Sequence, residues 1–371
     1  MSSPVSYLRP EQLQHDLGVR DLSDPAQGPH GIQLLVSGVV AALASAWGCR
    51  VRWCRGPRIV PVADNYDRLG YPAQAVTRES RYTRYVDAGR MLRSHSTAMV
   101  PPALLELAAA PGPDVLLVCP GIVYRRDAID WEHTGALHQL DLWRITERAM
   151  TAADLDQMIA VVLGAILPGL PYRDEPRIHP YTLGGRQVDV RLDGRWVEVG
   201  ECGLAHPDVL AAAGLVSRTG LALGLGLDRL LMGLKNIPDI RLLRSADPRV
   251  ARQMLDLRRY QPVSAMPAIT RDLSVAVGAD EDEETIGDRV RDTLGRDAHQ
   301  VEEVRVLAAT PCADLPDAAI ARLGARPGQK NLLVRVVLRD LDRTLTSPAA
   351  NDLRDRIYRA LHQGRVHQWA G

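Results

Sequence analysis

One arginine stands where a phosphate group could be bound. Arg125 lies on a predicted strand just before a loop that contains His133. A guanidinium presents a planar fork of donors that can bind phosphate oxygens in pairs. A lone arginine in such a position is more often part of a surface ion pair. This block by itself therefore leaves both interpretations open.

Two carboxylates are predicted to face each other across a hairpin. Asp193-Gly194 favours a type I′ turn between two alternating runs, and counting back from this turn pairs Asp189 with Glu198. Like charges directly opposite each other repel, and a Mg²⁺ ion between them would remove that cost. The alternative is a solvated pair on the surface of the hairpin.

A glycine-spaced strand that runs into a helix forms the third block. Its pattern, Gly224-x-Gly226-x-x-Arg229, leaves backbone open to a flat ring and places an arginine at the start of the helix. This signal is weak alone, and it matches neither the dinucleotide-binding fingerprint nor the P-loop. Taken in order on an antiparallel sheet, the three blocks describe an ATP site without a P-loop.

Strands and helices must hold these residues in place. Apolar residues at helical spacing predict helices over residues 32–47 and 152–167. On a predicted strand over 137–145, Gln139 and Asp141 point to the same face because side chains alternate along a strand. Further strands are expected over residues 115–119, 122–126 and 220–226, with the hairpin over 187–199.

Residue 261 begins a second predicted unit. The elements near residues 272–277, 285–294, 301–307, 331–338 and 348–361 follow the order strand, helix, strand, strand, helix, which predicts a ferredoxin-like α+β sandwich. We therefore expect a lead-in over residues 1–29, a main domain over 30–260 and a C-terminal domain over 261–371. From residue 322 onward basic residues outnumber acidic ones. This excess suits a nucleic-acid backbone or, alternatively, a solvated face.

The composition indicates a globular protein. The 371 residues have a formal net charge of zero, are 46% hydrophobic and include five scattered cysteines without a C-x-x-C pair, which argues against structural zinc. No apolar run is long enough to span a bilayer, and the N-terminus lacks the basic and apolar regions of a secretory signal, so we expect a cytoplasmic protein without a membrane partner. The chain contains no phenylalanine.

Several segments, in order, resemble those of phenylalanyl-tRNA synthetases, a family of class II aminoacyl-tRNA synthetases. They are residues 65–69 (NYDRL), 91–97 (MLRSHST), 121–127 (GIVYRRD), 137–139 (LHQ), 196–203 (WVEVGECG), 220–229 (GLALGLGLDR), 267–273 (PAITRDL) and 342–346 (DRTLT). The resemblance runs from about residue 60 to the C-terminus. It implies an α+β fold with an antiparallel sheet flanked by helices, followed by a ferredoxin-like anticodon-binding domain. The one-chain layout resembles the single-chain mitochondrial type, which implies a monomer.

The resemblance assigns roles to the matching positions. Arg125 and Arg229 would be the catalytic groups that hold the phosphates of ATP. ATP would also contact His133, Gly224 and Gly226, and Mg²⁺ would be held by Glu198 and Asp189. The amino acid would be bound by His95, Thr97, Gln139, Asp141, His179, Tyr181 and Ala222. Arg339 and Arg343 would contact tRNA.

The sequence departs from the family where the substrate ring should lie. The family's Phe-Pro-Phe is His179-Pro180-Tyr181 here, Glu201 replaces a glycine, and Asp141 replaces a glutamate. One explanation is a pocket changed to accept a relative of phenylalanine with a polar ring substituent. The other is a chain-wide loss of phenylalanine, with Tyr, Leu and His as substitutes. Positions that are not phenylalanine in the family also change, so we favour a divergent paralogue with an altered pocket.

The resemblance predicts ATP-dependent activation of phenylalanine or a close aromatic analogue as the aminoacyl-adenylate, then transfer to tRNA(Phe). One alternative is a paralogue that delivers the acyl group to a non-tRNA amine or carrier, and another is a non-catalytic tRNA-binding relative. Retention of Arg125, Glu198 and Arg229 argues against the non-catalytic relative. A synthetase without phenylalanine could be made while charged tRNA(Phe) is scarce, which predicts its accumulation when the housekeeping enzyme is blocked.

Overall fold

The chain divides into two compact units. The computed structural model describes residues 5–80, 82–192, 194–263 and 266–367. Unit 1 consists of Met1–Arg125, Ala136–Ile237 and Arg252–Tyr260, and unit 2 of Arg126–Gly135, Pro238–Ala251 and Gln261–Gly371. The second unit thus takes in two segments that precede residue 261.

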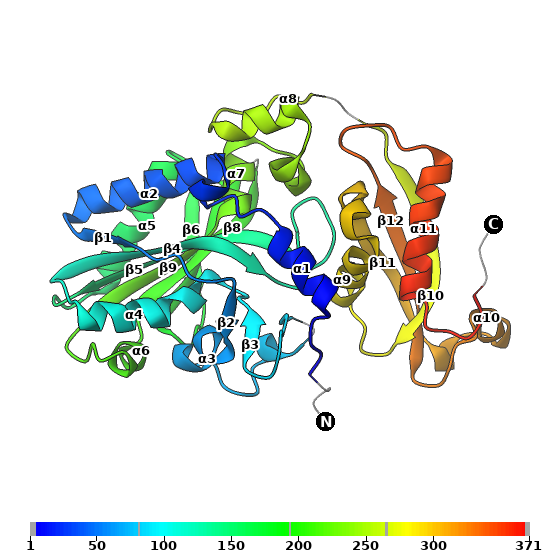
Figure 1. Ribbon diagram of the computed structural model, residues 1–371, viewed down its shortest axis with the longest axis horizontal. Helices are drawn as coiled ribbons and strands as arrows, with labels where there is room; N and C mark the ends of the chain where they lie inside the picture. The colour runs from blue at the N-terminus through cyan, green and yellow to red at the C-terminus, as the bar shows by residue number, and fades with distance from the viewer. Residues whose placement is uncertain (1–4, 81, 193, 264–265, 368–371) are drawn as a thin grey trace. The chain divides into compact units, whose positions relative to one another are not determined.

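A seven-stranded sheet forms the centre of unit 1 (Figure 1). Its strands are β1 (Arg50–Trp53), β4 (Asp114–Tyr124), β5 (Ala136–Thr146), β6 (Tyr172–Pro176), β7 (Thr182–Leu192), β8 (Arg195–Ala205) and β9 (Thr219–Gly226). They lie in the order β1-β4-β5-β9-β8-β7-β6, and all neighbours are antiparallel except β1, which is parallel to β4. A separate pair consists of β2 (Ile59–Pro61) and β3 (Arg90–Leu92).

The two strands expected over residues 115–119 and 122–126 are one strand. β4 runs unbroken through Pro120, which pairs with Leu140 of β5. Proline cannot donate to a ladder and is tolerated where one side of a strand is unpaired. β1 pairs with β4 only from Val115 to Val118, so Pro120 lies beyond the part of β4 that this neighbour covers.

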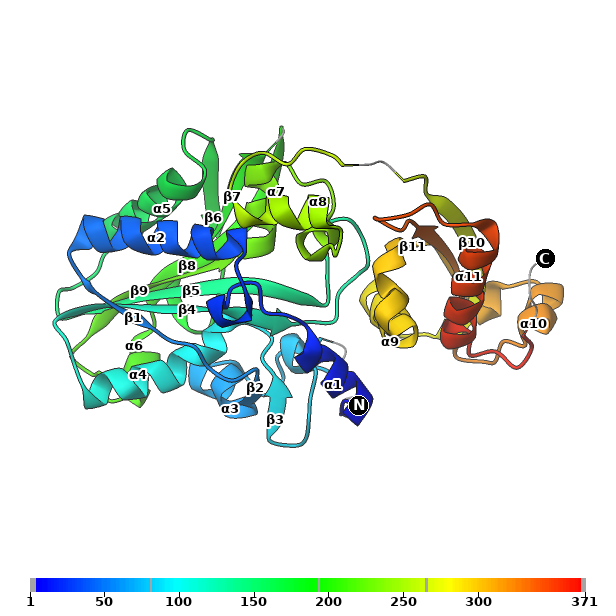
Figure 2. The same ribbon diagram turned by 45° about the horizontal axis from the view of Figure 1, so that its top comes forward.

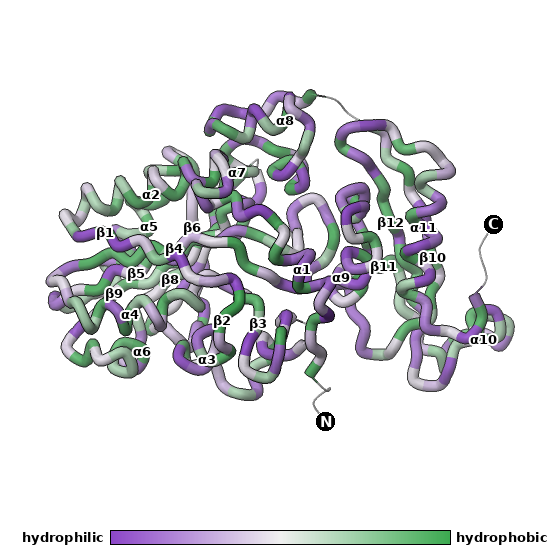
Figure 3. Tube along the Cα trace, viewed as in Figure 1, coloured by the Kyte–Doolittle hydropathy of each residue, from purple (hydrophilic) through white to green (hydrophobic). Residues whose placement is uncertain are grey.

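Helices cover both faces of the sheet. One face carries α2 (Gly31–Trp47), α5 (Ala152–Ile166) and α7 (Leu227–Lys235), whereas α3 (Val62–Asn65), α4 (Val100–Ala109) and α6 (Pro207–Ala212) lie on the other (Figure 2). A capping box of Thr151 with Asp154 fixes the start of α5, as in S/T-x-x-acid N-termini. Figure 3 shows hydrophobic residues along the central strands, where the two helical layers meet the sheet.

The helices α4 and α6 close only part of their face. Leu104 of α4 and Leu210 of α6 pack with Leu117 and Trp143 in one buried cluster. The side chains that follow on the same face, toward Gln139 of β5, are not in this cluster. The polar residues of the site lie on the same face, toward Gln139 of β5.

The segment expected as a lead-in folds as part of unit 1. It contains α1 (Pro10–Gly18), and Leu22 is buried. Asp16 forms a buried ion pair with Arg84 at 2.8 Å, and the backbone N–H of Leu22 donates to His138 of β5. Polar anchors between distant segments leave no signal in a local pattern, so the sequence did not reveal them.

The C-terminal part of unit 2 is a three-stranded antiparallel sheet with helices packed on it. Its elements are β10 (Ile269–Gly278), α9 (Glu283–Leu294), β11 (Val301–Pro311), α10 (Asp317–Leu323), β12 (Gln329–Leu338) and α11 (Ser347–Leu361). The strand order β10-β12-β11, with α9 and α11 packed together, is that of a ferredoxin-like unit with three strands in the described residues.

Two earlier segments belong to the same unit. Ile129, from the segment that links β4 to β5, is buried in the core of unit 2, and its carbonyl accepts from Val304 of β11 at 2.7 Å. Arg291 of α9 donates to the carbonyls of Asp127 and Ala128. The segment Pro238–Ala251 contains α8 (Pro248–Ala251). No helix in the described part of the chain is long and apolar enough to cross a membrane.

Candidate active site

A row of paired residues crosses the open face of the sheet in unit 1. Asp141 of β5 pairs with Gly224 of β9, and Gly224 pairs with Glu201 of β8. Directly paired residues of antiparallel strands point to the same face, so the two carboxylates share it. Gly224 lies between them without a side chain. An ideal Cβ there would lie 3.6 Å from the Asp141 carboxylate, so a larger residue would fill the space.

A β-bulge brings a second glutamate to this face. The register between β7 and β8 shifts by one residue next to Asp189, which leaves Val199 as the extra residue in β8. Such a bulge interrupts the alternation of side chains. Glu198 and Glu201 therefore face the same side although they are three residues apart. The predicted pairing of Asp189 with Glu198 is confirmed, and Asp193 of the predicted turn lies outside the described residues.

Charges link these glutamates to both predicted arginines. Burial and the negative charge of Glu201 raise the pKa of Glu198, and the positive charge of Arg229 opposes that rise. Burial also acts on Glu201, but a hydrogen bond and charge from His179, with the charges of Arg177 and Arg125, lower its pKa. Glu201 is thus ionised, and it lies within the electrostatic reach of Arg125.

Arg125 follows β4 on the same face of the sheet. Its Nε donates to the carbonyl of Ser94 at 2.9 Å, which fixes the direction of the guanidinium. Arg229 lies in the first turn of α7, directly after Gly226 ends β9. The positions beside Gly226 are open, because an ideal Cβ there would meet nothing within 4 Å. The end of β9 could therefore let a flat ring approach the backbone.

A buried carboxylate with hydroxyl donors forms one corner of the site. The Oδ2 atom of Asp141 accepts from Ser96 Oγ at 2.6 Å and from Thr97 Oγ1 at 3.1 Å. Burial raises the pKa of Asp141 to about 6, although these hydrogen bonds lower it. The Oε1 atom of Gln139 accepts from the backbone N–H of Ser96 at 3.1 Å. Three residues that the sequence assigned to the amino acid, Thr97, Gln139 and Asp141, therefore meet here with Ser96.

His95 lies beside this corner as a neutral imidazole. Burial and then the positive charge of Arg125 lower its pKa to about 3. Its Nε2 atom lies 3.3 Å from the Asn65 amide, and Nδ1 has no hydrogen-bond partner in the described part of the chain. The ring of Tyr71 lies 5.8 Å from it, centroid to centroid. His95 can therefore serve as a polar contact but not as a cation.

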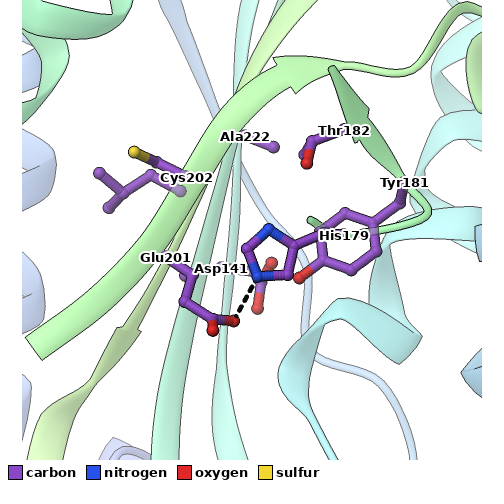
Figure 4. Close-up of a pocket in the computed structure, with 9 residues that line it drawn as sticks. Asp141, His179, Tyr181, Thr182, Glu201, Cys202 and Ala222 are labelled. Carbon is purple, nitrogen blue, oxygen red and sulfur yellow. Dashed lines mark ion pairs between the residues drawn. The ribbon is translucent and has the colours of Figure 1, made fainter. Parts of the chain in front are cut away.

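A small hollow lies next to Asp141 and is lined in part by the residues that replace the family's ring contacts. The hollow is nearly closed, with no room for a water-sized sphere, and Figure 4 shows the side chains around it. His179 stacks on Tyr181 with ring centroids 5.6 Å apart, and Tyr181 lies 6.2 Å from Trp143. The Nε2 atom of His179 lies 2.8 Å from Glu201 Oε2. Ala222 also lines the hollow.

The Asp189 carboxylate, opposite Glu198, is already bound by other side chains. Asp189 is held by Arg173, whose terminal nitrogen lies 2.9 Å from Oδ2, and Gln187 donates to its other oxygen at 2.9 Å. A carboxylate with both oxygens occupied makes a poor metal ligand. In the described residues, no group of three or more His, Cys, Asp or Glu side chains could hold a metal ion.

The remaining predicted residues belong to unit 2. His133 lies 2.6 Å from Asp130 through Nδ1. Arg339 pairs with Glu302, and Arg343 pairs with Asp340 at 3.1 Å while most of its side chain stays exposed. Their assignments to ATP and tRNA stay predictions.

Three residues of the site were not assigned from the sequence. Ser96 lies inside the matching segment 91–97, so that segment could have revealed it. Glu201 was noticed only as a departure from the family, because its place on the face depends on the bulge. Thr182 lines the hollow with Ala222 and directly follows His179-Pro180-Tyr181 in the sequence, so that segment could have revealed it.

The chain matches the family described as tRNA synthetases class II core domain (F) over residues 42–254. The phenylalanine–tRNA ligase alpha subunit of Nostoc punctiforme is 32% identical over 246 residues, which cover 65% of this chain and 73% of that protein. The alpha subunit of Synechocystis is 33% identical over 53% of this chain and 59% of its own length. That of Psychrobacter arcticus is 34% identical over 53% and 56%.

These relatives correct one expectation. They are alpha subunits of bacterial enzymes, so the predicted likeness to the single-chain mitochondrial type is not supported, and the expectation of a monomer that rested on it is in doubt. The chain spans little more than half the length of two of the three relatives. The antiparallel sheet with its flanking helices agrees with the matched core domain. The chain belongs to the family of class II aminoacyl-tRNA synthetases of the phenylalanine type.

Proposed function

We propose that this protein activates phenylalanine or a close aromatic amino acid with ATP and transfers the aminoacyl group to tRNA. The observation that carries this proposal is the single open face on which the Asp141 corner, the Glu198–Glu201 pair and the two arginines occur together. Family membership supports the same reaction.

The amino acid would be held at its charged end by the Asp141 corner. Ionised Asp141, kept in place by the hydroxyls of Ser96 and Thr97, would accept hydrogen bonds from the α-ammonium group. Gln139 and neutral His95 would position the carboxylate without repelling it or neutralising it. The ring would then enter the hollow beside Ala222.

Arg125 and Arg229 would bind the phosphates of ATP. In the first step a carboxylate oxygen of the amino acid attacks the α-phosphorus, an acyl–phosphate bond forms, and the bond to the leaving pyrophosphate breaks. Arg125 would stabilise charge on the α-phosphate, and Arg229 would hold the far end of the triphosphate. Positioning and charge neutralisation do most of the work in such a displacement.

The carboxylates fit a magnesium ion bound together with ATP. Mg²⁺ is usually held by one or two carboxylates plus phosphate oxygens and water. Glu198 can supply one such carboxylate, whereas the oxygens of Asp189 are bound by Arg173 and Gln187 and those of Glu201 lie against Arg177 and His179. When bound there, the ion would neutralise phosphate charge. We therefore propose Glu198 as the carboxylate ligand, in place of the predicted pair Glu198 and Asp189.

Transfer to the terminal ribose of tRNA would follow, with unit 2 as the proposed site of anticodon binding. The relatives are named as subunits, so the mass of the purified protein must be measured before a monomer is assumed.

ATP–pyrophosphate exchange with a panel of aromatic amino acids, followed by charging of tRNA(Phe), tests the proposal. We expect the protein to catalyse exchange, and we expect Arg125→Ala to lower kcat of exchange by about 10²–10³-fold. Arg148→Ala is the matched control, because that side chain is 56% exposed and contacts Asp154 and Met150 rather than residues of the site. Absence of exchange with every amino acid would refute activation, and exchange without charging would refute tRNA as the acceptor.

A further inference from the structure

Two buried polar atoms that line the ring hollow have no partner in the described residues. They are Nδ1 of His179 and Oγ1 of Thr182, whereas Nε2 of His179 has its ion-pair contact with Glu201 Oε2 at 2.8 Å. Both side chains are deeply buried, with exposed fractions of 8% and 7%. A buried polar group without a hydrogen bond is costly, so natural proteins satisfy such groups with protein, water or ligand.

The two atoms lie in the same part of the hollow. His179 and Thr182 both line it, and both atoms lie near Gly185, where an ideal Cβ would be 3.1 Å from His179 Nδ1 and 3.2 Å from Thr182 Oγ1. In Figure 4 the imidazole lies across the hollow, with its second nitrogen turned away from Glu201 and toward the side of Thr182 and Ala222.

The Glu201 carboxylate fixes the hydrogen-bonding character of His179. An ionised carboxylate only accepts, so the Nε2 atom that faces it at 2.8 Å must carry the proton. In the neutral ring Nδ1 is then an acceptor, while the Thr182 hydroxyl can either donate or accept. A hydroxyl on the ligand fits both atoms, because it donates to Nδ1 and accepts from Thr182.

The other walls are partly polar. Asp141 and Tyr181 also line the hollow, but Asp141 already accepts from Ser96 and Thr97. Ala222 is apolar, and burial raises the pKa of the Cys202 thiol to about 12, so it stays neutral. Among the wall residues, His179 and Thr182 carry buried polar atoms without a hydrogen bond in the described residues. An unsubstituted phenyl ring would leave these groups buried and unsatisfied.

We propose that the hollow selects an aromatic amino acid that carries a hydrogen-bonding substituent, a hydroxyl or an amino group, on its ring. His179, held by Glu201, and Thr182 are the specificity-determining residues. This inference rests on the proposed function, since it assumes that the side chain of the amino-acid substrate enters this hollow. A site built to hydrogen-bond a substrate hydroxyl discriminates strongly against the analogue that lacks it.

The test compares kcat/KM for ATP–pyrophosphate exchange across a matched panel. The panel holds phenylalanine, its ortho-, meta- and para-hydroxy derivatives, para-aminophenylalanine and para-methylphenylalanine, which matches the size of a hydroxyl without its hydrogen bonds. We expect at least one hydroxy or amino compound to exceed phenylalanine by about 10- to 100-fold. Equal or better activity with phenylalanine or the methyl compound would overturn the inference.

Two variants attribute the preference to the named residues. Thr182→Val removes the hydroxyl at nearly constant volume, and it should lower the ratio of kcat/KM for the preferred substrate to kcat/KM for phenylalanine by about tenfold. The double variant His179→Phe with Glu201→Gly should reverse the preference toward phenylalanine. A double variant at exposed sites, His15→Phe with Glu147→Gly, serves as the control. An unchanged preference in Thr182→Val and in the first double variant would overturn the assignment.

Calorimetric binding of the same panel keeps this inference separate from the proposed reaction. Binding of a hydroxy or amino compound without exchange would support the pocket chemistry and refute activation. Exchange that favours phenylalanine would support activation and refute the pocket chemistry. If no compound of the panel binds, the inference is wrong.

Discussion

Asp141→Asn should make the protein more stable at neutral pH and less active. Burial raises the pKa of Asp141 to about 6 from an ordinary value of 3.8, a difference that corresponds to about 3 kcal/mol. Because the folded chain binds this proton more tightly than the unfolded chain, the ionised group destabilises the fold above its folded pKa. The cost is about 3 kcal/mol at about pH 7.5 and about 1 kcal/mol at about pH 4.5.

In Asp141→Asn a neutral amide of nearly the same shape replaces the carboxylate, so this pH dependence of the stability is lost. Its oxygen can still accept from Ser96 and Thr97, but its NH₂ group would face the Trp143 N–H, which lies 3.4 Å from Oδ1. That mismatch reduces the absolute gain, so the informative quantity is the change with pH. We expect the variant's gain in the free energy of unfolding to be about 2 kcal/mol larger at about pH 7.5 than at about pH 4.5.

Urea unfolding at the two pH values measures this difference, with Asp208→Asn as the matched control because that carboxylate is 92% exposed. For the unchanged protein, kcat/KM of exchange should fall about tenfold between about pH 7.5 and about pH 5 as Asp141 becomes protonated. In the variant, kcat/KM should no longer fall at acidic pH. Its value should be lower by about 10- to 100-fold, because the charge-assisted hydrogen bond to the ammonium group is lost. If Asp141→Asn gains the same free energy of unfolding at both pH values, burial does not raise the pKa of Asp141. If kcat/KM of the variant still falls at acidic pH, Asp141 does not bind the ammonium group.

Three further changes test other parts of the structure. Leu43→Ala removes a fully buried side chain of α2 and should cost about 2–5 kcal/mol in the free energy of unfolding, which urea denaturation measures; a cost below about 1 kcal/mol would contradict the packing. Gly287→Ala places a Cβ 2.8 Å from the carbonyl of Asp127, so faster hydrogen exchange in residues 126–129 is expected, and unchanged exchange would argue against that contact. Glu198→Gln should raise the Mg²⁺ concentration needed for half-maximal exchange about tenfold or more, whereas Asp189→Asn should not, and the reverse result would restore the predicted pair.

The sequence by itself determined the local elements and the family. Apolar periodicity located α2 and α5 because one buried face recurs every turn of a helix. Alternation and the Asp193-Gly194 turn gave the register of the β7–β8 hairpin, because short loops leave little choice of pairing. Matching segments identified Arg125, Glu198 and Arg229 without any knowledge of their surroundings.

Only the tertiary structure decided how these residues can act. The bulge at Val199, which brings Glu201 to the face of Glu198, arises from pairing with two neighbouring strands and left no signal in the sequence. The ion pair that occupies Asp189 depends on Arg173 of the adjacent strand. Local patterns report which face of an element is apolar. Which polar groups meet across that face depends on contacts between distant segments, and it is these contacts that set charge, burial and pKa in the site.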